Sequence, residues 1–293
     1  MESTRRSALL LEASLLSAAL ALGTNPVAVK YAAAQIPPLP FVALRFTLAG
    51  VVLLGVLKLL EPETRIKPRD LLPVALLGAI GIGFNNVIFT YGVSLTSASD
   101  TALIYATPPL WGMMLGFALG LEQPKARGIL GIFVALIGVG IVVYGGLSLG
   151  QTSLAGDLLV AGAAVCWGSY TAYSAVLLRR YSPLAVAAYT TLVAGLTVLA
   201  VASPQIMGIE WSNVGAGAWA AAAYSALFVA AFGFTSWQRG ISHIGANRVL
   251  VYQYLVTLTG VVCGILFFGE SLGLNMIVGG IIILLGVYVA RRQ

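Results

Sequence analysis

Eleven side chains that can bind a small molecule stand inside long apolar stretches of the sequence. They are three asparagines, two glutamines, four tyrosines and two tryptophans: Asn25, Asn85, Asn86, Tyr91, Tyr105, Trp167, Tyr170, Trp237, Gln238, Tyr252 and Gln253. Amides and hydroxyls hydrogen-bond an ammonium or a carboxylate, and indole and phenol faces accept an apolar or cationic group. Because such groups are costly in apolar surroundings, the sequence predicts that they line a cavity.

The sequence shows no comparable set of residues that could carry out catalysis. The chain has one histidine, His243, and two cysteines, Cys166 and Cys263, which stand in apolar runs and are expected to act as small hydrophobic residues. It contains no phosphate-binding GxxxxGK[ST] loop and no set of metal ligands. We therefore expect no enzyme, no cofactor and no metal. Two alternatives stay open. An enzyme that acts on lipid inside the membrane would need a cluster of acid, base or metal ligands, which the sequence does not show. A scaffold or sensor would need a soluble domain to bind its partner, and the predicted loops are short.

Composition requires a membrane for the elements that position these groups. Hydrophobic residues make up 59% of the 293 and charged residues 9%, with a mean hydropathy of +0.95. So little polar surface cannot cover a water-soluble body of this size. About 20 apolar residues span a bilayer, and the sequence predicts an all-α integral membrane protein of ten spanning helices: 8–30, 38–58, 71–93, 97–119, 126–145, 155–177, 183–203, 217–238, 246–268 and 272–290. For Tyr91, Trp237 and Tyr254 the alternative is an aromatic belt at the membrane interface.

The two halves of the chain repeat each other. A shift of 148 positions superimposes glycines and one glutamate, including Gly92 on Gly240 and Glu122 on Glu270, and a shift of 145 brings Pro38 onto Pro183. Such matches indicate an internal repeat, with a first five-helix unit at 1–146 and a second at 147–293. Because five is odd, the second unit must enter the membrane from the opposite side, which predicts an inverted repeat with a binding site between the halves.

Basic residues indicate the orientation. With the N-terminus inside, fourteen of the sixteen Lys and Arg residues fall on the cytoplasmic side, as the positive-inside rule predicts, and only Lys30 and Arg45 do not. We expect a multi-pass protein of the inner membrane with both termini cytoplasmic. The net charge of +6 is explained by this topology and not by a nucleic-acid partner. Arg5-Arg6 and the following apolar run also fit a secretory signal, but the segment recurs in the second half and so belongs to the fold.

Short motifs carry a resemblance to a known family. Trp167-Gly168, Leu44-Arg45-Phe46, and the helix-ending Leu121-Glu122 and Gly269-Glu270 before glycine-rich helices resemble the EamA-type exporters of the drug/metabolite transporter superfamily. The resemblance implies export by alternating access, through a cavity lined by helices 1, 3, 4, 6, 8 and 9. The sequence departs from that family at Leu22-Gly23, where Trp-Gly is common, and at Val256, where a helix-breaking proline is usual.

Small residues and prolines predict where helices pack or bend. Gly112 and Gly116 form a GxxxG pattern, and Gly260 and Gly264 form its equivalent in the second half; we expect internal packing, with a dimer interface as the alternative. Pro26 in the first helix and Pro108-Pro109 in the fourth remove backbone hydrogen bonds and predict a bend. Either bend can serve packing alone or act as a hinge.

Charged residues inside the spans are few. The other acids, Asp157 among them, are expected at helix ends or in loops, and only Glu12 and Asp100 inside helices; these two are therefore the candidates for proton coupling, with exchange and uniport left open. We expect Lys30 and Arg45 to form a structural ion pair with Asp100, with a substrate carboxylate as the alternative.

Together these features predict a secondary transporter that exports small metabolites, most of all amino acids. Efflux of drugs or cations is the alternative, and phosphorylated sugars are a weaker one because only two basic residues are in reach. The expected partners are a small-molecule substrate and the lipid bilayer. The sequence leaves the oligomeric state open, a monomer included.

Overall fold

The computed structural model describes residues 2–118, 126–148 and 153–291, and within these ranges the chain is helical and contains no strand. The helices and short turns follow one another as α1 (Glu2–Ala33), α2 (Pro38–Leu60), η1 (Pro68–Asp70), α3 (Leu71–Leu76), η2 (Leu77–Phe84), α4 (Asn85–Leu95), α5 (Ala98–Ile104), α6 (Pro108–Ala118), α7 (Ala126–Ser148), α8 (Leu154–Leu177), α9 (Pro183–Met207), η3 (Trp211–Asn213), α10 (Ala216–Tyr224), η4 (Ser225–Gly233), α11 (Phe234–Ile244), α12 (Ala246–Val249), η5 (Leu250–Tyr252), α13 (Gln253–Phe268) and α14 (Leu274–Arg291).

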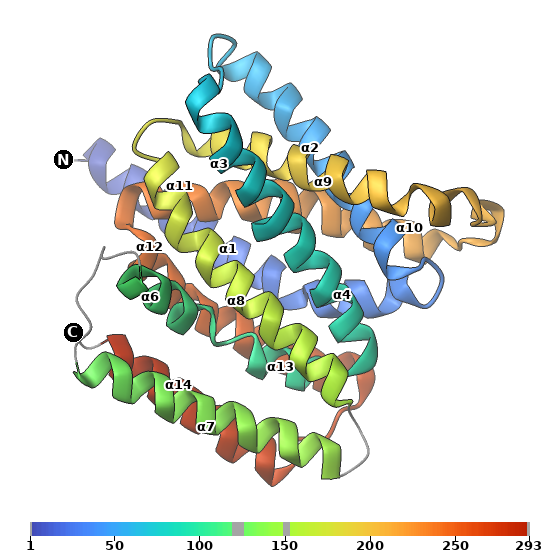
Figure 1. The fold of residues 1–293 in the computed structure, drawn as a ribbon, viewed down its shortest axis with the longest axis vertical. Coiled ribbons are helices and arrows are strands. Elements are labelled where there is room, and N and C mark those ends of the chain that lie inside the picture. Colours follow the sequence, from blue (N-terminus) through green and yellow to red (C-terminus); the bar gives the residue numbers. More distant parts are fainter. Residues whose placement is uncertain (1, 119–125, 149–152, 292–293) are drawn as a thin grey trace.

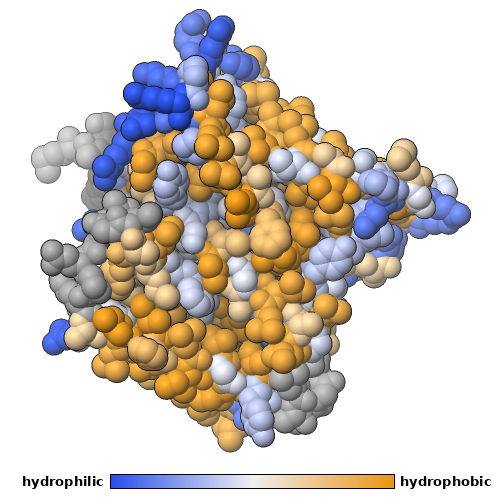
Figure 2. All heavy atoms as spheres, in the orientation of Figure 1, coloured by the Kyte–Doolittle hydropathy of each residue, from blue (hydrophilic) through white to orange (hydrophobic). Residues whose placement is uncertain are grey.

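Seven segments of the described chain are long and apolar enough to cross a membrane: Leu9–Ala33, Pro38–Leu60, Pro68–Leu95, Ala126–Gly145, Pro183–Met207, Ala216–Ile244 and Leu250–Phe268. Large hydrophobic side chains such as Leu59, Phe133 and Leu266 are exposed. In Figure 2 apolar residues cover most of the visible face, and hydrophilic residues gather near the end of α2 and around the loop between α9 and α10. A surface of this kind is matched to lipid, so the protein is a multi-pass membrane protein.

Residues at the helix starts explain why these segments begin where they do. Pro38 and Pro183 occupy the first turns of α2 and α9, where a missing backbone N–H costs nothing. Serines cap three starts: Ser97 accepts from Asp100 N at 2.8 Å, Ser153 from Gly156 N at 3.0 Å, and Ser182 from Ala185 N at 3.1 Å.

Two helix pairs form opposite edges of the bundle. α2 packs on α9 and α7 packs on α14, with α1, α4, α8 and α13 between them (Figure 1). A Cβ added at Gly50 would lie 2.5 Å from Leu192 Cα, and one added at Gly195 would lie 2.5 Å from Thr47 N. Thr47 and Gly50 correspond to Leu192 and Gly195 at the shift of 145, so the contacts are reciprocal.

The second pair of helices shows the same reciprocity. A Cβ at Gly138 on α7 would lie 2.7 Å from Ile283 N, and one at Gly286 on α14 would lie 2.7 Å from Ala135 Cα. The shift of 148 exchanges these two contacts. Reciprocal contacts between equivalent residues are the mark of a twofold relation.

The glycines of the GxxxG patterns make internal contacts. A Cβ at Gly112 would lie 3.1 Å from Gly168 O, and one at Gly168 would overlap Pro108 O. In the other half, a Cβ at Gly260 would lie 3.4 Å from Gly23 O, and one at Gly23 would lie 2.6 Å from Val256 O. The two sites thus bring α6 against α8 and α13 against α1, as expected for internal packing. The surroundings of Gly116 are not among the described features, so its packing stays a prediction.

Helix irregularities occur at matched places. Two π-helical segments, η2 and η4, begin at Leu77 and Ser225, which are 148 residues apart. Pro108 and Pro109 open α6 after a break that separates it from α5, whereas α1 continues as a helix through Pro26. In the second half, which lacks the proline at Val256, the 3-10 turn η5 precedes α13 instead.

Candidate functional site

A cavity lies between the two halves, with an empty volume of about 570 Å³ that includes the space at its open side. Its wall comes from α1, α4, α5, α8, η4, α11 and α13. Six of the eleven polar and aromatic side chains singled out from the sequence line it: Asn25, Asn85, Asn86, Tyr105, Trp167 and Gln253. Thr101, Phe89, Phe234 and Val256 complete much of the remaining wall. Sequence patterns did not single out the three apolar residues as part of the wall, because apolar residues recur on every face of these helices.

A buried amide network forms one side of the cavity. Arg45, which is 2% exposed, donates to Asn86 Oδ1, to Asn25 Oδ1 at 3.1 Å and to Ser225 Oγ at 2.5 Å. Asn86 Nδ2 donates to Asn85 Oδ1 at 3.0 Å, and Asn85 Nδ2 donates to Tyr105 Oη at 3.4 Å. The network therefore joins α1, α2, α4, η4 and the end of α5.

Both asparagines of the Asn85-Asn86 pair bond neighbouring segments while lining the cavity. Asn85 also donates to Ala163 O on α8 at 2.5 Å, and Asn86 also donates to Ile82 O at 2.9 Å. Each of the two amides therefore both lines the cavity and holds a neighbouring segment.

Residues related by the repeat meet across the cavity. Gln253 Nε2, on α13, donates to Tyr105 O at 2.7 Å. This bond satisfies the carbonyl that the break between α5 and α6 leaves without a helical partner. A Cβ at Gly260 would also lie 2.7 Å from Ala102 Cβ, so α5 and α13 pack closely beside this bond.

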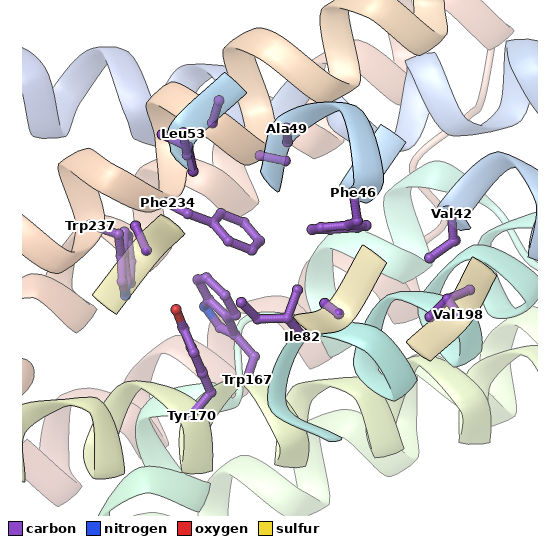
Figure 3. Packing of buried hydrophobic residues seen from close by; sticks show 14 of the residues in the cluster. Val42, Phe46, Ala49, Leu53, Ile82, Trp167, Tyr170, Val198, Phe234 and Trp237 are labelled. Atoms are coloured by element: carbon purple, nitrogen blue, oxygen red, sulfur yellow. The ribbon is translucent and has the colours of Figure 1, made fainter. Parts of the chain in front are cut away.

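An aromatic cluster backs the opposite side (Figure 3). The Trp167 ring lies 5.1 Å from Phe234, 5.4 Å from Tyr170 and 5.7 Å from Trp237, measured between ring centroids. Trp167 and Phe234 face the cavity, while Trp237 is 0% exposed behind them. Trp237 therefore does not belong to an interfacial belt.

The other five predicted side chains lie away from the cavity: Tyr91, Tyr170, Trp237, Gln238 and Tyr252. Gln238 donates to Tyr170 Oη at 2.6 Å and to Ser174 Oγ at 3.1 Å, and Trp237 donates to Thr171 Oγ1 at 3.3 Å. These bonds join α11 to α8 and satisfy Nε2 of the buried Gln238 amide inside the protein. The sequence could not distinguish these residues from those that line the cavity. A polar side chain avoids lipid equally well by facing the cavity or by hydrogen-bonding another helix.

Glu270, in the loop before α14, ties that loop to the start of α5, whose residues Thr101 and Ala102 line the cavity. Its carboxylate accepts from Ala98 N and Ser99 N, both at 2.8 Å, and Lys30 Nζ lies 3.4 Å away. Burial raises the pKa of Glu270, but the two backbone N–H groups and Lys30 outweigh it, so the pKa is lowered overall. Lys30 thus pairs with Glu270 and not with Asp100, and Arg45 forms no ion pair among the described residues.

The two coupling candidates differ in their surroundings. Asp100 is 0% exposed in the first turn of α5, and neither carboxylate oxygen has a hydrogen-bond partner among the described residues. Glu12 is exposed on α1. Asp157 was expected at a loop or helix end; it does lie in the first turn of α8, but it is buried there and accepts from Thr96 Oγ1 at 2.6 Å.

A membrane-embedded helical body with a polar and aromatic cavity at its centre, lined by helices from both halves, defines a membrane carrier. Comparison with known proteins makes the class specific: the chain belongs to the EamA-like transporter family, whose family model matches residues 9–144 and again residues 154–292. The family confirms the prediction that the chain is a transporter and not an enzyme.

Relatives in other organisms agree. The chain is 28% identical to a Bacillus subtilis (strain 168) protein named "Uncharacterized transporter YyaM", over 89% of this chain and 87% of that protein. It is also 28% identical to a Streptantibioticus cattleyicolor protein named "Probable terminal-alkyne amino-acid exporter", over 78% of this chain and 76% of that protein. A solved crystal structure shares the fold with a TM-score of 0.67 at 20% identity, covering 98% of this chain and 97% of that chain.

Proposed function

We propose that this protein exports amino acids across the inner membrane by alternating access. In this proposal the chain crosses the membrane ten times as two inverted five-helix repeats, 1–146 and 147–293, with both termini cytoplasmic. The reciprocal contacts between α2 and α9 and between α7 and α14 support a twofold relation of the halves. In Figure 1 α1 begins and α14 ends on the same side, which fits an even number of crossings.

The chemistry of the cavity carries the substrate assignment. Its wall combines amides and a tyrosine hydroxyl with Trp167, Phe89 and Phe234. The polar groups suit the ammonium and carboxylate common to all amino acids, and the aromatic and apolar groups suit a side chain. One relative that bears the name of an amino-acid exporter supports the same class.

Efflux of an apolar cation is the second candidate. The rings of Trp167 and Phe234 favour it, because aromatic faces attract cations. Cation efflux would use the same alternating-access mechanism as amino-acid export. The two differ only in the charge of the substrate that the cavity must accept.

Asp100 is the residue we propose for proton coupling, if transport uses a proton. Its buried carboxylate lies in the same short helix whose start is held by Glu270. A change in its charge would therefore act where α5 meets the loop before α14. Exposed Glu12 lacks such a contact.

Counterflow in proteoliposomes tests the function. Vesicles preloaded with one unlabelled amino acid should take up the labelled form without an imposed gradient, and Gln253→Ala or Asn85→Ala should abolish uptake while the protein still inserts. Tyr144→Phe, a change at an exposed position on α7, is the control and should transport normally. Absence of counterflow with every amino acid would refute the substrate class.

A further inference from the structure

Arg45 is a buried cation without a carboxylate. It lies in the middle of α2, is 2% exposed, and forms no ion pair among the described residues. Its neighbours are amide and hydroxyl oxygens and the rings of Phe41 and Phe46, 5.3 and 4.6 Å from Cζ. An uncompensated charge at membrane depth is costly and marks a functional site.

The guanidinium fixes the orientation of every amide around it. Arginine can only donate hydrogen bonds, so Asn25 and Asn86 must turn their oxygens toward Arg45. Asn86 Nδ2 then faces Ile82 O and Asn85 Oδ1, and Asn85 Nδ2 faces Ala163 O and Tyr105 Oη. The two backbone carbonyls accept only, and they independently require the same orientations.

Two donors are left pointing toward the cavity by this arrangement. Asn25 Oδ1 accepts hydrogen bonds from Arg45 and Ser225, and Asn25 Nδ2 makes no hydrogen bond to the described residues. Tyr105 Oη accepts from Asn85, which leaves its own proton available. Both residues line the cavity, whereas Arg45 stands behind them. Each chain of hydrogen bonds is polarised away from the positive charge, which strengthens the donor at its end.

We propose that the cavity binds its substrate through a carboxylate, which accepts hydrogen bonds from Asn25 Nδ2 and Tyr105 Oη, and that Arg45 is the positioning residue that makes both groups donors. This inference deepens the proposed function and rests on its cavity. It assigns one end of the substrate a negative charge. A ligand with a cation and no anion would meet two donors and a buried positive charge.

Gln253 provides the complementary group. Its Nε2 is used by Tyr105 O, so its Oε1 is the acceptor that remains on the cavity wall. An α-ammonium group can donate to this oxygen. The cavity thus presents donors for a carboxylate and an acceptor for an ammonium, and it prefers a zwitterion or an anion over a cation.

Matched ligands test this assignment on the purified full-length protein. Calorimetric titration at pH 7 compares phenylalanine with 3-phenylpropanoate, which keeps only the carboxylate, and with phenylalaninamide, which keeps the amine but loses the charge on the acid. A second set uses leucine, 4-methylpentanoate and leucinamide. In each set we expect both ligands that have a carboxylate to bind roughly tenfold to a hundredfold more tightly than the amide, which is the range for hydrogen bonds to a charged group.

Variants separate recognition from folding. Asn25→Asp is nearly isosteric, neutralises Arg45 and removes the donor, so it should reduce the preference for carboxylate over amide at least about tenfold. Tyr105→Phe should reduce it less, since one donor remains. The ratio of the two affinities is the readout, because a misfolded variant would lose both ligands. Asn213→Asp and Tyr144→Phe, at exposed positions, are the matched controls and should keep the ratio.

The outcomes of this test and of the counterflow test are distinct. Carboxylate preference that disappears in Asn25→Asp supports the inference even if no amino acid shows counterflow, in which case the proposed substrate class fails alone. Equal binding of acids and amides, or a preference unchanged in Asn25→Asp, overturns the inference even if amino acids are transported.

Discussion

Replacing Glu270 by Gln should loosen the contact between α5 and the loop before α14. The carboxylate accepts two backbone N–H groups of α5 and lies next to Lys30. Gln keeps one acceptor oxygen, so the change loses about one hydrogen bond to a charged group, roughly 1.5–3 kcal/mol. If the bond forms only in the outward-closed conformation of the proposed alternating access, the equilibrium should shift about 10-fold to 150-fold toward the outward-open conformation.

Access to a cysteine in the cavity wall measures this shift. With Cys166 and Cys263 replaced by Ala, Thr101→Cys places a thiol on α5 in the cavity wall. In the proposed topology the fourth predicted helix, 97–119, starts on the outside, so a membrane-impermeant maleimide added from outside should label this thiol faster when Glu270→Gln is also present. Glu210→Gln, a change in the exposed loop after α9, is the matched control and should not alter labelling. Equal labelling rates with and without Glu270→Gln would refute the role of Glu270 in closure.

The same contact predicts a dependence on pH. The lowered pKa of Glu270 means that the folded protein favours the charged carboxylate. Its stabilisation is therefore complete above the ordinary value of 4.5 and is lost as pH falls through the lowered pKa. The melting temperature of the wild type should exceed that of Glu270→Gln at pH 7 and at pH 5, and the difference should shrink only in stronger acid. A difference that disappears already at pH 5 would contradict this assignment.

Three further changes probe other parts of the chain. Gly168→Ala should destabilise the protein by about 1–3 kcal/mol because the new Cβ overlaps Pro108 O, whereas Gly55→Ala, with nothing within 4 Å, should be neutral or stabilising in thermal denaturation. Asp70→Asn should lower the melting temperature, since Asp70 accepts from Tyr181 Oη and Arg180, both at 2.7 Å; an unchanged value would count against that cluster. Asp100→Asn should remove any response of uptake to an imposed pH gradient while preserving counterflow, and a response that persists would exclude Asp100 as the coupling residue.

Sequence was sufficient for features that local chemistry determines. The predicted helices 38–58 and 183–203 begin at the prolines that start α2 and α9. The repeated glycines predicted internal packing of the fourth and ninth helices, and α6 lies against α8 and α13 against α1. Glycine works in this way because only a missing side chain lets two backbones come that near, whatever the rest of the fold does.

The site was harder to predict, because the helices that line it are apolar on every face. Trp237 and Gln238 resemble cavity residues by type, and only the rotation of α11 turns them toward α8. The partners of Arg45 come from positions 25, 86 and 225, brought together by the tertiary structure. The sequence predicted an ion pair for Arg45. That prediction was wrong because residue spacing contains no information on contacts between positions so far apart in the chain.

The reciprocal glycine contacts also bear on how such a chain can arise. At each edge of the bundle a helix lies against its own counterpart from the other half, α2 against α9 and α7 against α14. Two separate copies of one such half could make the same contacts with each other, since a twofold interface needs only one self-complementary surface. Gene fusion would then require no new interface, and each half could afterwards diverge, as Asn85 and Gly233 have at equivalent positions.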